Sequence, residues 1–149
     1  MPKPVLQAMV LADHVYQDRV TGKFIIAGTF SSVWFGRVAP DPSGQTTGPV
    51  SKSGSPHLYI ALVEMHGDVP LNLKFLDLSD SSVLFEGQLV LSSNDPIAVS
   101  EYAIPLPPLP TSRPGHYSLD LLYDGEILGS WRVSVSERKD LSSELGAEQ

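Results

Sequence analysis

The chain has 149 residues, enough for one domain that hides about two thirds of its unfolded surface. Its formal net charge of −7 at pH 7 argues against nucleic acid and anionic membranes as partners, because both attract clusters of Lys and Arg. The sequence contains no cysteine, which excludes disulfides, thiolate catalysis and zinc-thiolate sites.

The first residues form a short apolar stretch that ends at Ala12, where Asp13 and His14 follow. A signal peptide needs a longer apolar core and a small-residue cleavage site, and no segment approaches the length of a membrane span. We therefore expect a cytoplasmic protein with no membrane partner, and we predict a strand over residues 5–16.

Strand signals continue along the chain, whereas no segment has a persuasive helical period. Runs rich in Val, Ile and aromatic residues cover residues 23–38, 58–65, 71–78, 83–91, 97–104 and, as a hairpin of two strands, 117–135. Turn residues separate them, and we predict hairpins at Thr21-Gly22 and at His66-Gly67-Asp68. The pattern predicts an all-β fold: a single β-sandwich of about eight strands, immunoglobulin-like, with a jelly roll as the alternative.

Two segments differ from the rest in composition. Residues 39–56 are rich in Pro, Gly, Ser and Thr, which predicts a long mobile loop. Residues 137–149 predict a charged tail, either disordered or one short helix. We therefore place the sandwich domain at residues 1–136.

The proline-rich segment at residues 104–115 must be extended, because each proline fixes φ and removes a donor. Pro107 and Pro110 have the spacing of a peptide ligand for an aromatic groove. The favoured interpretation is a stiff crossover between the sheets, with Leu106 and Leu109 against the core edge.

The last hairpin contains Asp124-Gly125, and the length of its loop decides which face is buried. A three-residue loop from Tyr123 to Gly125 brings the apolar positions into register. It predicts one buried face with Asp120, Ser118 and Arg132 outside; the buried set is Tyr117, Leu119, Leu121, Ile127, Trp131 and Val133.

No spacing of catalytic or metal-binding residues is present in the sequence. Asp77, Asp80 and Asp95 are weak metal candidates, because some sandwiches bind calcium through loop carboxylates, but Asp is also a default turn residue. We expect no resident metal and no cofactor. We also expect no enzymatic activity.

Two segments are candidates for interaction with a partner. The first strand is apolar on both faces, so we expect a symmetric homodimer involving Val5 to Asp13, with Val5, Met9 and Leu11 as contact candidates. The alternative is a monomer whose first strand is buried by the tail after Val135. Trp34 and Phe35 follow Val33 where the alternation breaks, so one of the two faces carries an unexpected aromatic ring.

Three stretches resemble a family of small uncharacterised bacterial all-β proteins that is catalogued as a domain of unknown function. They are LADHVYQDRVTGKFIIAGTF, HLYIALVEMHGDVPLNLKFLDL and RPGHYSLDLLYDGEILGSWRVSV, and the resemblance covers most of residues 5–136. It implies no catalytic residue. The PGxY…DG ending is also common in immunoglobulin-like sandwiches.

The leading hypothesis is therefore a non-enzymatic binding or assembly module that acts through protein–protein contacts with an unidentified partner. The alternative is a metal-dependent or hydrolytic enzyme with its site at the loop end of the sandwich.

Overall fold

The computed structural model describes residues 3–36, 50–51, 55–111 and 113–138, and these residues form ten strands and no helix. The strands are β1 (Val5–Gln17), β2 (Phe24–Thr29), β3 (Ser32–Gly36), β4 (Val50–Ser51), β5 (His57–Val63), β6 (Gly67–Asp77), β7 (Ser82–Ser93), β8 (Ser100–Pro105), β9 (Gly115–Tyr123) and β10 (Glu126–Arg138).

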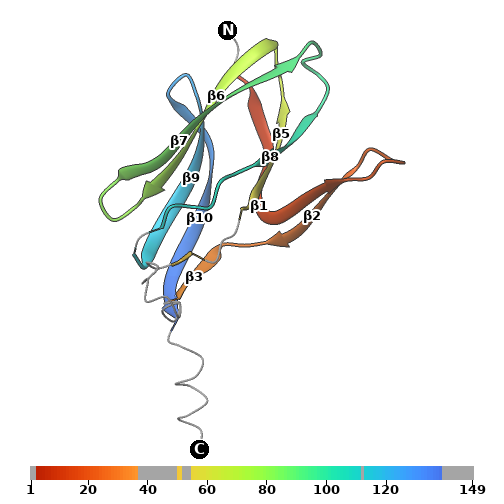
Figure 1. Cartoon of the computed structure of the whole chain (residues 1–149). Coiled ribbons are helices and arrows are strands. Elements are labelled where there is room, and N and C mark those ends of the chain that lie inside the picture. The colour runs from red at the N-terminus through yellow and green to blue at the C-terminus, as the bar shows by residue number, and fades with distance from the viewer. Residues whose placement is uncertain (1–2, 37–49, 52–54, 112, 139–149) are drawn as a thin grey trace, which may run out of the picture.

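The strands pair into two sheets that face each other (Figure 1). Sheet A has four strands in the order β2-β1-β5-β8, and sheet B has six in the order β4-β3-β10-β9-β6-β7. The core lies between them and contains leucines from both sheets, with Phe75 stacked on Tyr117 at 5.5 Å between ring centroids. The predicted all-β sandwich is confirmed.

Two features make the sandwich immunoglobulin-like. The hydroxyl of Tyr117, near the start of β9, donates a hydrogen bond to the backbone carbonyl of Arg113 at 2.6 Å, which is the tyrosine corner of such domains. In addition, β3 pairs parallel to β10, whereas jelly rolls are built from antiparallel strands.

The chain passes from sheet A to sheet B within a segment that the sequence predicted to be one strand. Residues 23–38 were expected as one strand, but they divide into β2 in sheet A and β3 in sheet B. At the break, the indole Nε1 of Trp131 donates to the carbonyl of Phe30 at 2.9 Å, which satisfies a backbone group that no neighbouring strand pairs.

The hairpin predicted at His66-Gly67-Asp68 is wrong, because β5 and β6 belong to different sheets. Glu64 has a φ of 59° and Gly67 a φ of 67°, so the chain turns out of sheet A. Met65 is buried between these turns. By contrast, the Thr21-Gly22 hairpin is confirmed by antiparallel pairing of β1 with β2.

The predicted register of the last hairpin is also wrong. Tyr123 pairs with Glu126 across a two-residue loop, in which Asp124 and Gly125 both have positive φ. A β-bulge at Leu128 then shifts the register, so that Leu121 pairs with Gly129.

The bulge explains why the predicted faces are nevertheless partly right. Tyr117, Leu119, Leu121 and Val133 are buried as predicted, and Trp131 is half-buried. Ile127 precedes the bulge and is 53% exposed. Ser118 and Asp120 alternate with the core residues onto the outer face of sheet B, as predicted, but are only 6% exposed there. Arg132 is exposed as predicted.

The proline-rich crossover is confirmed, because Leu106 and Leu109 are buried against the core. Most of the predicted loop at residues 39–56 lies outside the described residues, although β4 within it pairs with β3. Of the predicted tail, residues 139–149 lie outside the described residues, and β10 continues to Arg138.

Tyr117→Phe should lower the free energy of unfolding by about 1 kcal/mol, because the carbonyl of Arg113 loses its donor. Urea denaturation measures the change. Tyr123→Phe in the same strand is the control, and an equal loss in both variants would contradict a special role for the corner.

Candidate binding face

The register of sheet A divides its side chains between the core and the outside. In β5, Leu58, Ile60 and Leu62 are fully buried in the core, so the residues between them point outward. Directly paired residues share a face. The outward positions of sheet A are therefore Val5, Ala8, Val10, Ala12, His14, Tyr16, Ile25, Ala27, Thr29, His57, Tyr59, Ala61, Val63, Glu101, Ala103 and Pro105.

This outer face of sheet A is unusually apolar. An antiparallel sheet with one solvated face normally alternates apolar and polar side chains. Here Val10 pairs with Tyr59 and Ala8 with Ala61, and Glu101 is the one formally charged side chain among the outward positions. Ala12 and Ala61 point outward by alternation but are already covered by their neighbours, with 0% and 4% exposure.

The outer face of sheet B provides an internal comparison. Its paired positions include charged side chains: Lys74 lies opposite Asp120 and Glu86, and Arg132 opposite Ser118. Apolar side chains share this face, because Val83, Val90 and Ile127 lie on it and are 48%, 64% and 53% exposed. The carboxylate of Asp120 accepts hydrogen bonds from the hydroxyls of Ser118 at 2.6 Å and Ser130 at 2.7 Å. The two outer faces therefore differ in charge: that of sheet B carries several charged side chains, and that of sheet A carries Glu101.

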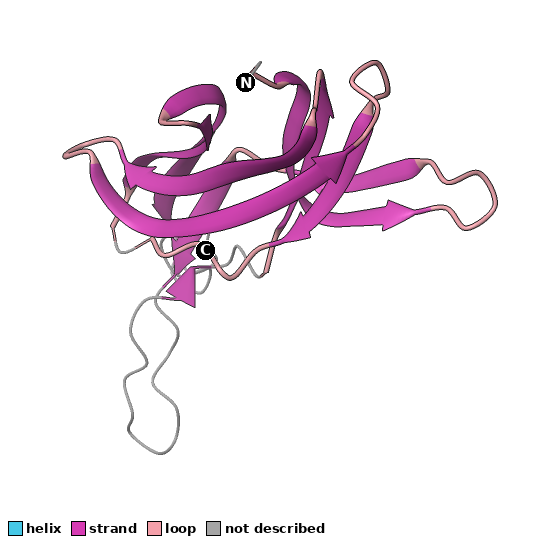
Figure 2. Ribbon diagram, turned by 90° about the horizontal axis from the view of Figure 1, so that it is seen from above, coloured by secondary structure: helices cyan, strands magenta, loops and turns pink. Residues whose placement is uncertain are grey.

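The distal part of the β1–β2 hairpin, residues 13–28, projects from the sandwich (Figures 1 and 2), and we call it the arm. On it Tyr16 and Ile25 pair directly and are 54% and 53% exposed, and Val20 at the tip is 93% exposed. An isolated two-stranded hairpin is marginally stable in water, and these side chains lack the burial that would stabilise it.

Ring contacts join the arm to the outer face of sheet A. Phe24 of the arm lies 5.7 Å from Tyr59 between ring centroids, and His14 lies 5.9 Å from His57 and 5.7 Å from Tyr16. The arm and the sheet thus form a corner with aromatic rings on both sides.

The direction of the arm depends on Gly28, which has a φ of +74°. A Cβ atom at this position would lie 2.6 Å from Oδ2 of Asp13 on the paired strand. Only glycine fits this conformation and this close approach.

Two polar contacts stabilise the corner. His57 Nδ1 donates to the carbonyl of Asp13 at 3.1 Å, which ties β5 to the base of the arm. The hydroxyl of Tyr59 donates to the carboxylate of Glu101. Burial, the hydrogen bond to Glu101 and its negative charge together raise the pKa of Tyr59 to about 12.

The structure separates the predicted interaction residues. Val5 points outward and is 49% exposed, Met9 packs against the core, and Leu11 is fully buried within it. Of Trp34 and Phe35 the structure describes only the backbone, in β3. The sequence showed that both faces of the first strand are apolar. It did not show that Ala8 and Val10 lie on the outward face, because that assignment requires the pairing with β5.

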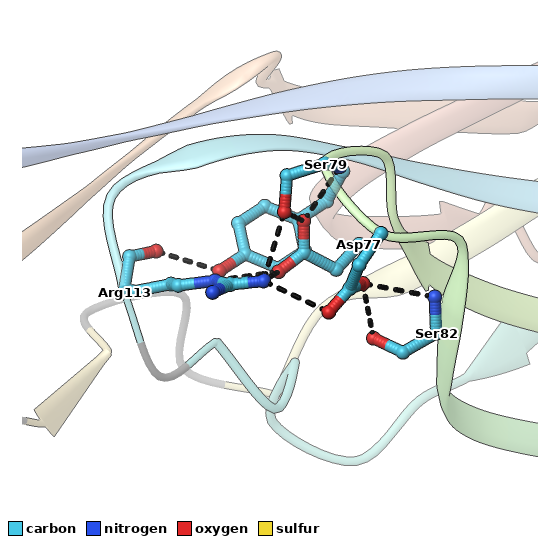
Figure 3. A network of polar contacts seen from close by, with 6 residues as sticks. Asp77, Ser79, Ser82 and Arg113 are labelled. Carbon is cyan, nitrogen blue, oxygen red and sulfur yellow. Dashed lines mark hydrogen bonds and ion pairs between the residues drawn. The ribbon is translucent and has the colours of Figure 1, made fainter.

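Two of the predicted metal candidates are held by an arginine instead (Figure 3). Arg113 Nη2 lies 2.9 Å from Oδ2 of Asp77 and 3.0 Å from Oδ2 of Asp80. Hydrogen bonds from Ser79, and then the hydrogen bond and the charge of Arg113, hold the pKa of Asp77 below its usual value. Hydrogen bonds from Ser82 lower the pKa of Asp80 similarly.

The third candidate, Asp95, lies past the opposite end of β7, where its carboxylate accepts from the backbone N–H of Ile97 at 3.0 Å. Among the described residues no three His, Asp or Glu side chains are grouped so that they could hold a metal ion. The Asp77–Arg113 cluster instead holds the β6–β7 turn against the proline-rich crossover.

Comparisons with known proteins identify a similar structure but no family. No protein-family model matches the chain, and no curated protein matches it. A crystal structure of an immunoglobulin-like protein from Pseudomonas aeruginosa is similar, with a TM-score of 0.44 and 13% sequence identity over 91% of this chain and 98% of that one. Within the described residues there is no helix long and apolar enough to cross a membrane.

Tyr59 should ionise only near pH 12, and Glu101→Gln should lower its pKa without returning it to 10, because burial is the largest cause of the shift. The folded state holds this proton more tightly than the unfolded state, so this contribution to stability is present below pH 10 and is lost between about 10 and 12. Ultraviolet titration measures the pKa, and Tyr59→Phe identifies the transition. An unchanged pKa in Glu101→Gln would contradict the role of that carboxylate.

Proposed function

We propose that this protein is a non-enzymatic binding module that contacts a protein partner through the outer face of sheet A and the arm. The observation that carries the proposal is the contrast in charge between the outer faces of one sandwich. Lys74, Asp120 and Arg132 lie on the outer face of sheet B, whereas Glu101 is the one formally charged side chain among the outward positions of sheet A.

Burial of apolar area supports the choice of a protein partner. Removing apolar surface from water contributes about 25 cal/mol for each Å². The outward positions extend from Val5 along β1 and continue onto the arm at Tyr16. An extended surface of this kind is typical of contact with a macromolecule, whereas small ligands bind in concave pockets.

The arm adds a second element to the same surface. Its exposed pair, Tyr16 and Ile25, lies on the outward side of the hairpin, and the ring of His14 connects this side to His57. A partner that docks on the sheet therefore also meets the arm. Tyrosine is enriched in the central residues of interfaces, which fits this placement.

The experiment uses a photo-crosslinking amino acid at Ala103, an exposed outward position of β8, in cells that produce the protein. The matched control carries it at Gln88, an exposed position on β7 of sheet B. We expect covalent protein adducts from position 103 and not from 88, and their loss when Val10→Asp is added. Equal adducts from both positions, or none from position 103, would refute the proposed function.

A further inference from the structure

We propose that the partner on the outer face of sheet A is a second copy of this chain. The two copies are related by a two-fold axis that lies midway between their two facing copies of sheet A. This inference rests on the proposed function and specifies its occupant. The axis runs across the strands, between the row formed by Val10 and Tyr59 and the row formed by Ala8 and Ala61.

Charge favours a second copy as the occupant. The chain carries a formal net charge of −7, so two copies repel wherever carboxylates face each other. The outer face of sheet A carries one, Glu101, whose carboxylate already accepts from Tyr59. Interfaces between identical subunits are more apolar than those between transient partners, which use charge to select one another.

The sizes of the side chains match across the proposed axis. In β1 and β5 a row of large side chains, Val10 and Tyr59, adjoins a row of small ones, Ala8 and Ala61. The two-fold rotation exchanges the rows, which places Val10 over the partner copy's alanine 8 and Tyr59 over its alanine 61. Large over small is the arrangement that lets facing sheets interdigitate at about 10 Å.

The arm fits the same arrangement. It leaves the sheet beyond Ala12 at one end of the face, and Val5 and Val63 form the row at the other end. The rotation brings the arm of each copy beside the far end of the other. Tyr16, Ile25 and Val5, each about half exposed in the single chain, are then covered together.

The first test is the mass in solution by light scattering at micromolar concentration. We expect twice 16.1 kDa for the full chain. The same rotation places Ala103 over the partner's Glu101, since they occupy the exchanged rows of β8. Ala103→Asp should therefore raise the dissociation constant about tenfold or more, and Ala103→Lys should not raise it.

The controls separate a lost interface from a lost fold. Gln88→Asp adds the same charge to the outer face of sheet B and should leave the mass unchanged, and circular dichroism should show the same strand content in every variant. A single-chain mass for the unmodified protein would overturn the proposal. So would equal effects of Ala103→Asp and Ala103→Lys.

The second test locates the proposed two-fold axis relative to the rows of residues 8 and 10. The chain lacks cysteine, so single variants Ala8→Cys and Val10→Cys each carry one reactive thiol. A short bis-maleimide should join Ala8→Cys to Val10→Cys in an equal mixture more readily than it joins Gln88→Cys to itself. No preference would overturn the proposed rows.

The outcomes also distinguish this inference from the proposed function. If position 103 crosslinks to a different protein while the purified chain has a single-chain mass, the binding module stands and the second copy is wrong. If position 103 gives no adduct with any protein, the proposed function itself fails.

Discussion

The pairing of β1 with β5 is the constraint on which the rest of the molecule depends. It places Leu11 and Leu58 side by side in the core and, by the same alternation, Val10 and Tyr59 on the outside. A shift of one residue would exchange these sets, so the hydrophobic core and the apolar outer face are fixed by one register. The bulge between Leu6 and Ala8 also lets Leu6 pack against the core while Val5 stays outside.

The features that the sequence alone predicted are those that depend on residues close together in the chain. Alternation and turn chemistry identified the strands, the Thr21-Gly22 hairpin and the crossover that buries Leu106 and Leu109. It could not predict where the chain changes sheet, because the turns at Glu64 and at Phe30 depend on contacts with distant residues. Trp131, which binds the carbonyl of Phe30, is 101 positions away in the chain.

The outer face of sheet A was likewise predicted only in part. The first strand was recognised as apolar on both sides, yet Met9 and Leu11 were named as contact residues although they face the core. Alanines at positions 8 and 61 give no signal of an outward face in a sequence, since alanine is among the residues most often buried. Their meaning appears only when pairing brings them together beside Tyr59.

Gly28 gives the surface a particular sensitivity to inherited change. Its φ of +74° and its close approach to Asp13 fix the angle at which the arm leaves the sheet, yet the residue is exposed and not part of the core. A single codon change there would re-aim the arm while the sandwich kept its packing. Related chains could therefore diverge in what they assemble with while their folds stayed the same.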